Sequence, residues 1–230
     1  MIHVDISVLL PLRDAESTVA RLVTTAEAIH ERVTSRHHAN GRALVLEILA
    51  LDERSGDNTS SMLSVLHGQH PQLRTVQDLV RGSALRAAAR LARGDVWLVI
   101  DRPVAIDLAA WAVGQVIVGQ RAAIVPGEIL AIHRSVGVDV LRTLDGGLAV
   151  AQRVCARYLR RLGETPALCP APDTSRLDRA LFFLRSRTDR VGLGFLDRPP
   201  PARAGVLDDT DAPADPARAR SGSILRRRLL

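Results

Sequence analysis

The chain of 230 residues contains no lysine, so all 31 of its basic residues are arginine. Aromatic residues make up only 3% of the sequence, and a hydrophobic core must therefore be built from Ala, Val, Leu and Ile. Surfaces that bind single-stranded nucleic acids stack bases on aromatic rings, and the sequence shows no basic stripe outside residues 147–162. We therefore expect no nucleic-acid partner.

Cysteine is also scarce. Cys155 and Cys169 are too few for a disulfide framework or a cysteine metal cluster, and we interpret both as small apolar side chains of a reduced protein. The first residues lack the basic region and cleavage site of a signal peptide. No apolar run approaches the roughly 18 residues that suggest a membrane span. The sequence therefore predicts a cytoplasmic protein.

The formal net charge is +6 and the hydrophobic share is 47%. A chain of this length and composition predicts one domain plus an appendage. A positive charge suits phosphate or anionic lipid headgroups. However, the arginines are spread along the chain, which favours ordinary solvated side chains.

Apolar segments with strand and helix spacing alternate from the first residues onward, which predicts an α/β fold with a mostly parallel sheet flanked by helices. The predicted strands are 4–10, ending at Pro11, and 43–51, 73–76, 96–100, 122–125 and 128–133, and residues 165–170 are expected to return toward the sheet. The predicted helices are 15–33, 59–67, 83–92, 108–118, 147–162 and an amphipathic helix at 176–190. Asp14 or Ser17 is expected to cap the first helix, and Asp57 or Asn58 the second.

Acidic residues follow three of these strands. Asp14 and Glu16 follow the first strand, Asp52 and Glu53 the second, and Asp101 the fourth. In parallel α/β sheets, ligands bind beyond the carboxyl ends of the strands. The sequence therefore predicts one ligand site at the edge where these three strand ends meet.

Three segments, SVLLPLRDAESTV, ILALDERSGDNT and RGSALRAAARLARGDVWLVID, together resemble the family 2 glycosyltransferases in order and spacing over about the first 105 residues. The resemblance implies a GT-A (Rossmann-like) fold and transfer of a sugar from a UDP- or GDP-sugar. By the same resemblance, Asp52 or Glu53 would hold the base. Ser55, Asp57 and Thr59 are expected to shape the loop. The nucleotide-sugar site would comprise Pro11, Arg13, Asp14, Asp52, Glu53, Gly82, Asp101 and Arg102.

The chain departs from the family at its metal-binding strand end, which usually reads Asp-x-Asp. This chain reads Asp101-Arg102-Pro103, so Asp101 is the one candidate metal ligand left and Pro103 offers no side-chain oxygen. A divalent cation (Mn²⁺ or Mg²⁺) prefers several oxygen ligands, and its binding should be weakened. Arg102 could pair with the diphosphate instead, or Asp107 could replace the missing ligand. We favour a degenerate motif.

The resemblance also implies a carboxylate base that deprotonates the acceptor hydroxyl. Asp145 and Glu128 are the candidates, and Asp145 is favoured because the segment after it resembles the family's. Asp145 could equally cap the helix that follows, and Glu128 could be a turn residue. His133 is a metal ligand by resemblance, but a histidine satisfied inside the protein fits its position better.

Two functions therefore remain open. One is a sugar transferase acting on an unknown acceptor, a glycan, lipid carrier or protein, as in polysaccharide biosynthesis. The other is an inactive pseudoenzyme, a GT-A module that binds nucleotides or proteins. A dinucleotide-binding Rossmann domain would need a glycine-rich turn after the first strand, but Pro11-Leu12-Arg13-Asp14 stands there.

The domain is expected to span residues 1–197. Residues 198–230 are rich in Pro and Asp with little apolar bulk, which predicts a disordered tail. The tail ends in ILRRRLL, a basic-apolar end that could touch the inner face of an anionic membrane weakly. It also resembles the short signals that load cargo into encapsulin shells.

Overall fold

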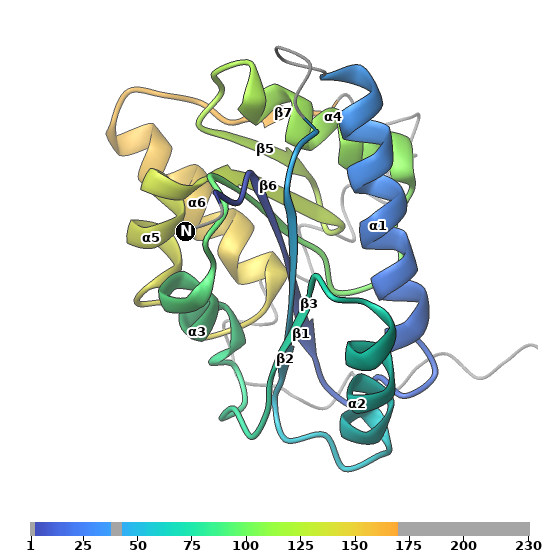
Figure 1. Ribbon diagram of the computed structural model, residues 1–230. Coiled ribbons are helices and arrows are strands. Elements are labelled where there is room, and N and C mark those ends of the chain that lie inside the picture. Colours follow the sequence, from blue (N-terminus) through green and yellow to red (C-terminus); the bar gives the residue numbers. More distant parts are fainter. Residues whose placement is uncertain (1–2, 38–42, 170–230) are drawn as a thin grey trace, which may run out of the picture.

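The structure is a computed structural model that describes residues 3–37 and 43–169 (Figure 1). The predicted helix over 176–190, the predicted tail over 198–230 and the domain boundary at 197 lie outside these residues. None of the helices in the described ranges combines the length and apolarity needed to cross a membrane.

A seven-stranded sheet lies at the centre of the described chain, in the order β3-β2-β1-β4-β6-β5-β7. β1 pairs in parallel with β2 and β4, β2 with β3, and β5 with β7, whereas β6 runs antiparallel to β4 and β5. The predicted α/β fold with a mostly parallel sheet is therefore confirmed. The strands are β1 (Ile6–Leu12), β2 (Leu46–Asp52), β3 (Leu73–Val76), β4 (Val96–Val99), β5 (Ala122–Val125), β6 (Ile129–His133) and β7 (Ala167–Leu168).

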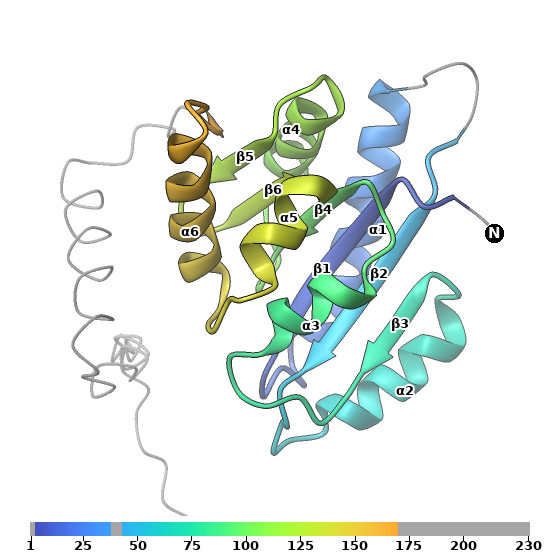
Figure 2. The same ribbon diagram turned by 90° about the vertical axis from the view of Figure 1, so that its left-hand side faces the viewer.

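Helices cover both faces of the sheet, which gives three layers (Figures 1 and 2). One face is packed by α1 (Val19–Arg36), α2 (Thr59–Gln69) and α4 (Ile106–Ile117). The opposite face is packed by α3 (Ala84–Leu91), α5 (Arg134–Leu141) and α6 (Leu148–Arg161).

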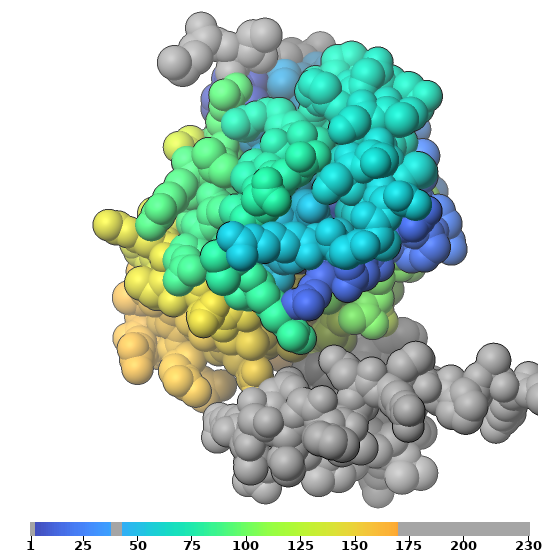
Figure 3. Space-filling view, turned by 90° about the horizontal axis from the view of Figure 1, so that it is seen from below, coloured from blue at the N-terminus to red at the C-terminus, as the bar shows by residue number. Residues whose placement is uncertain are grey.

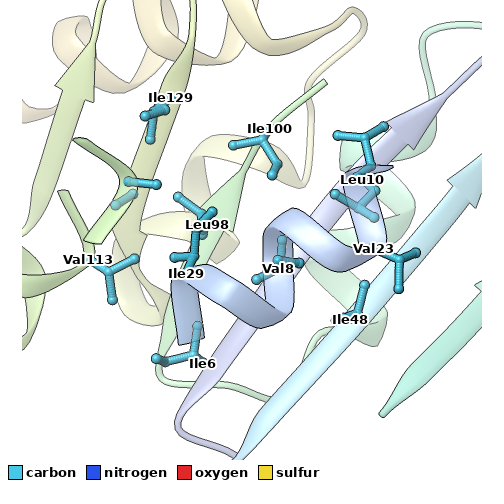
Figure 4. Packing of buried hydrophobic residues seen from close by; sticks show 14 of the residues in the cluster. Ile6, Val8, Leu10, Val23, Ile29, Ile48, Leu98, Ile100, Val113 and Ile129 are labelled. Carbon is cyan, nitrogen blue, oxygen red and sulfur yellow. The ribbon is translucent and has the colours of Figure 1, made fainter. Parts of the chain in front are cut away.

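The central strand β1 shows why its sequence is a continuous apolar run. Ile6, Val8 and Leu10 point to the α1 face and pack among residues of that helix (Figure 4). Leu9 points to the other face and packs with the layer of α3, α5 and α6. A strand buried on both faces needs apolar residues at successive positions rather than alternating ones.

Pro11 does not end the first strand, contrary to prediction, because β1 continues through it to Leu12. The Leu12 carbonyl accepts a hydrogen bond from the backbone N of Glu53, the residue after β2. The Leu9 carbonyl accepts one from the backbone N of Ile100, the residue after β4. Alternate residues of β1 therefore bond to opposite neighbours, and Pro11 faces the β4 side. The last β1–β4 pair is Leu9 with Val99, so the N–H that proline lacks has no strand to bond. β1 and β4 part at this point.

Helix α5 was not predicted from the sequence. Its segment RSVGVDVL contains three valines and a glycine, residues with weak helix propensity. Packing contacts stabilise the helix in place of intrinsic propensity. Gly137 fits against Trp97, where an added Cβ would lie 2.5 Å from the Trp97 Cε3, and the His133 side chain caps the helix by accepting from Ser135 N.

Candidate functional site

The carboxyl ends of β1, β2 and β4 lie at one edge of the sheet, called the carboxyl edge from here on. In the parallel ladder Leu12 lies beside Asp52, and Leu9 lies beside Val99, two residues before Asp101. Figure 3 looks onto this edge, where the blue segment after β1 and the cyan segment after β2 adjoin. The predicted meeting of the three acid-bearing strand ends at one edge is confirmed.

Hydrogen bonds join the loop after β1 to the loop after β2. Asp14 N donates to Ser55 Oγ at 2.9 Å, and the Asp14 carboxylate accepts from Gly56 N at 2.7 Å. Ala15 N donates to Thr59 Oγ1 at 2.8 Å. The bonds are reciprocal, because each loop supplies both backbone donors and side-chain acceptors.

The same pairing continues toward the two helices. Glu16 N donates to the Asp57 carboxylate at 2.9 Å, and the Glu16 carboxylate accepts from both nitrogens of Asn58. The dense set of oxygen acceptors from Ser55 to Thr59 therefore shapes the loop, as expected. α1 begins only at Val19, and its N-cap is Thr18 without a side-chain cap bond, so the predicted caps Asp14 and Ser17 are wrong.

Asp52 is buried, with 2% of its surface exposed. Its carboxylate accepts from the backbone N and the hydroxyl of Ser55, and from the Ser60 hydroxyl at 3.1 Å. Ser60 was missed in the sequence, because nothing local marks a hydroxyl on the first turn of α2 as a partner of Asp52. A carboxylate has about four acceptor positions, so Asp52 keeps little capacity for a ligand. Its contact with a base stays a prediction.

Glu53, Gly82 and Asp145 are brought together. The Glu53 carboxylate accepts from Gly82 N and Ala84 N, both at 2.9 Å, at the start of α3. The Gly82 carbonyl accepts from Gly146 N at 2.8 Å, and an added Cβ at Gly82 would lie 3.0 Å from Asp145 Oδ1. The φ angle of Gly82 is +78°, a region that favours glycine.

Asp145 is exposed. The N-cap of α6 is Gly147, without a side-chain cap bond, so the helix-capping interpretation of Asp145 is wrong. Its side chain forms no hydrogen bond or ion pair with another described residue. The carboxylate is therefore open to a ligand or an acceptor.

Asp101 and Arg102 form an ion pair of 2.9 Å between Asp101 Oδ1 and Arg102 Nε. This bond and the charge of Asp101 raise the pKa of Arg102, and the charge of Glu128 adds to the effect. Glu128 therefore lies close enough for its charge to act on Arg102, and both side chains are exposed. Arg13 is exposed too and pairs with Asp14 at 3.7 Å.

These residues do not fit a divalent cation held by the protein. The Asp101 carboxylate is engaged by a guanidinium, and Pro103, two residues further on, offers no side-chain oxygen. Asp107 pairs with Arg36 of α1 at 2.8 Å, which removes it as a substitute ligand. Within residues 3–37 and 43–169, no three His, Cys, Asp or Glu side chains group in a way that could hold a metal ion.

His133 lies at the other edge of the sheet. It pairs with Val96, the first residue of β4, and its Nδ1 bonds the Ser135 hydroxyl at 2.8 Å. Asp101 follows the opposite end of β4, so His133 does not share a site with it, and the His133 ring is partly exposed rather than enclosed in the interior as expected.

No protein-family model matches the chain, and no curated protein matches it. Solved structures do. A mannosyltransferase from Pyrobaculum calidifontis, in complex with GDP-Man and Mn²⁺, is 18% identical with a TM-score of 0.51, over 83% of this chain and 65% of that one. The mannosyl-3-phosphoglycerate synthase from Rubrobacter xylanophilus is 18% identical with a TM-score of 0.53, over 82% of this chain and 74% of that one. The chain spans less than two thirds of the mannosyltransferase. With its mostly parallel sheet covered by helices on both faces, the chain has the GT-A fold.

Proposed function

We propose that the chain binds a nucleotide-diphospho-sugar, a UDP- or GDP-sugar, at the carboxyl edge and transfers the sugar to an acceptor. The observation that carries the proposal is the parting of β1 and β4 at this edge, beside the ends of all three acid-bearing strands. Ligands of parallel sheets bind at such points. The proposed pocket residues are Pro11, Arg13, Asp14, Asp52, Glu53, Gly82, Asp101 and Arg102.

Arg102 is proposed to hold the diphosphate in place of a metal ion. The mannosyltransferase of similar fold contains Mn²⁺, but the residues around Asp101 do not fit such an ion. Arg102 is 63% exposed and uses its Nε on Asp101, which leaves its terminal nitrogens for phosphate oxygens. A guanidinium matches phosphate geometry with paired donors, and its raised pKa keeps it charged.

Asp145 is the proposed base. It would take the proton of the acceptor hydroxyl while the acceptor oxygen bonds to the anomeric carbon of the sugar. The bond from that carbon to the diphosphate breaks, and the nucleoside diphosphate leaves with the electron pair, which inverts the sugar carbon. Asp145 suits this role better than Glu128, because the charge of Glu128 already acts on Arg102, whereas Asp145 has no described partner.

A second function is a GT-A module that binds nucleotides without catalysis. The Asp101–Arg102 pair and Pro103 favour it, since the usual carboxylate pair is gone. The two functions predict the same nucleotide binding and differ in whether the bound sugar is transferred or hydrolysed. The acceptor class and any membrane contact of the tail stay open in both.

Calorimetric titration with UDP and GDP, with Mn²⁺ and with EDTA, tests the proposal. We expect binding that persists in EDTA and weakens by about 10- to 100-fold in Arg102→Ala, the equivalent of one or two charge-assisted bonds. Arg142→Ala is the matched control, because Arg142 is an exposed arginine after α5. Binding that EDTA abolishes would refute the role of Arg102. Absence of binding at millimolar nucleotide would refute the site.

Hydrolysis of UDP- and GDP-sugars then separates the two functions. A transferase hydrolyses the bound sugar slowly with water as acceptor, and Asp145→Asn should lose this activity while it keeps nucleotide affinity. If Glu128→Gln loses the activity instead, Glu128 is the base. If the wild-type chain binds the nucleotide and leaves the sugar intact with every acceptor class, the binding module is correct.

A further inference from the structure

A cavity lies at the opposite edge of the sheet, called the amino edge from here on. Its volume is about 750 Å³, within the range of small-molecule sites. The segments before β1 and β4, the first residues of β2 and β3, and the residue after β6 bring its charged side chains together. These are His3, Glu47, Arg74, Arg93 and Arg134.

Glu47 forms the floor of this cavity and is only 4% exposed. Its carboxylate accepts from the Ser7 hydroxyl at 2.6 Å and from Arg93 N at 2.9 Å. It also pairs with the Arg74 guanidinium. A buried carboxylate needs such partners, and these bonds occupy most of its acceptor positions.

Three arginines line the cavity, and only one of them is needed to neutralise the Glu47 carboxylate. Arg74 already neutralises the carboxylate. The Arg93 guanidinium is 66% exposed and comes no closer to Glu47 than 4.0 Å. The exposed Arg134 guanidinium bonds the Arg93 carbonyl at 3.3 Å and has no other partner among the described residues. Arg93 and Arg134 line the cavity, and nearly all of their guanidinium donors are without a partner among the described residues.

Two nearby acids, Asp5 and Asp95, are not among the residues that line this cavity. They lie 3.4 and 3.2 Å from His3, which is charged only when protonated, and both line a separate, smaller hollow. The cavity wall thus carries three guanidiniums against one carboxylate. A phosphate monoester carries about −1.5 to −2 at neutral pH, which matches the two guanidiniums left over.

We propose that the amino-edge cavity binds a phosphate-bearing small molecule through Arg93 and Arg134. Two adjacent guanidiniums can each offer paired N–H donors to the phosphate oxygens. Arg74 and Glu47 hold the floor in place beneath them. Val4, Leu46 and Pro71 supply apolar wall for the remainder of the ligand. This site is independent of the nucleotide-sugar site, which lies at the other end of the strands.

Trp97 provides a local reporter. Its indole N–H donates to the Gly94 carbonyl at 2.8 Å, one residue from Arg93. The chain has two tryptophans, so Trp111→Phe leaves Trp97 as the only indole signal. In this background, titration with inorganic pyrophosphate should shift the Trp97 indole N–H resonance in a saturable way.

We expect Arg93→Ala/Arg134→Ala to weaken this titration by about 10- to 100-fold, as the loss of paired charge-assisted bonds implies. The Arg93→Lys/Arg134→Lys variant keeps the charge but loses the paired donors, and its affinity for pyrophosphate should fall between those of the wild type and the alanine variant. Arg157→Ala/Arg160→Ala removes two exposed arginines of α6 and should change the affinity less than threefold, which is about 0.65 kcal/mol. The unliganded Trp97 resonance verifies that each variant is folded.

Arg102→Ala separates this site from the proposed nucleotide-sugar site, because it should leave the Trp97 titration unchanged. A Trp97 signal that does not respond to pyrophosphate would overturn the amino-edge site. Equal weakening by the Arg93/Arg134 and Arg157/Arg160 variants would overturn it too, since that result indicates diffuse attraction to a basic protein.

Discussion

Glu53 tests whether the carboxyl edge is held together by the bonds described. Its carboxylate joins the end of β2 to the start of α3 through Gly82 N and Ala84 N, both at 2.9 Å. Glu53→Ala removes this acceptor and leaves two backbone donors at a helix start without their partner. The Gly82 carbonyl in turn accepts a hydrogen bond from Gly146 N. The substitution should therefore also destabilise the segment before α6.

The expected loss of stability follows from the number and setting of these bonds. A side chain that caps a helix start contributes about 1 kcal/mol, and a hydrogen bond to a charged group about 1.5–3 kcal/mol. Glu53 is partly exposed, so water replaces part of each bond. We therefore expect Glu53→Ala to lower the free energy of unfolding by about 2 kcal/mol. Glu53→Gln keeps one acceptor oxygen and should lose about half as much.

Urea denaturation followed by circular dichroism measures this loss. Glu128→Ala is the matched control, because Glu128 is an exposed glutamate at the same edge and should change stability by less than about 0.5 kcal/mol. A Glu53→Ala protein as stable as the wild type would refute the reasoning. Equal losses in Glu53→Ala and Glu128→Ala would also refute it, since they would indicate a general charge effect.

Three further predictions follow from single sites. Gly82→Ala should cost about 1–2 kcal/mol in urea denaturation, because its φ is +78° and the new Cβ would press on Asp145; an unchanged midpoint would contradict this geometry. Burial raises the pKa of Cys155 to about 12, so a thiol reagent at about pH 8 should label it only after unfolding. The hydrogen bond from the Thr59 hydroxyl lowers the pKa of Asp57 in the folded protein. The Asp57 carboxylate therefore stabilises the fold at pH values above the pKa that it has in the unfolded chain. This stabilisation is lost as the pH falls through the lower pKa of the folded state. Asp57→Asn should therefore weaken the acid dependence of unfolding, and an unaltered pH profile would count against it.

Much of the sheet could be predicted from the sequence, because apolar runs bounded by turns determine buried strands. β3 and β5 have the bounds that the sequence predicts. β2 begins three residues and ends one residue later than predicted, and β4 ends one residue earlier than predicted. Pro11 misled the prediction, because a proline ends a strand only where its missing N–H would face a paired neighbour.

The positions of the acidic residues at the strand ends could be predicted from the sequence, but their hydrogen-bond partners could not. The type of fold places the acids at one edge, and the sequence already marks them. The partners of Asp52 and Glu53 depend on how α2 and α3 pack, which no local pattern encodes. Helix α5 was missed for the same kind of reason, since its stability comes from the contact of Gly137 with Trp97 rather than from propensity.

The crystal structure of the protein soaked with UDP and Mn²⁺ tests the central claim most directly. The proposal predicts nucleotide density at the carboxyl edge beside Asp52 and Asp101, with the diphosphate on the Arg102 guanidinium. Nucleotide density found elsewhere, or a diphosphate at this edge held by Mn²⁺ with Arg102 turned away, would contradict it.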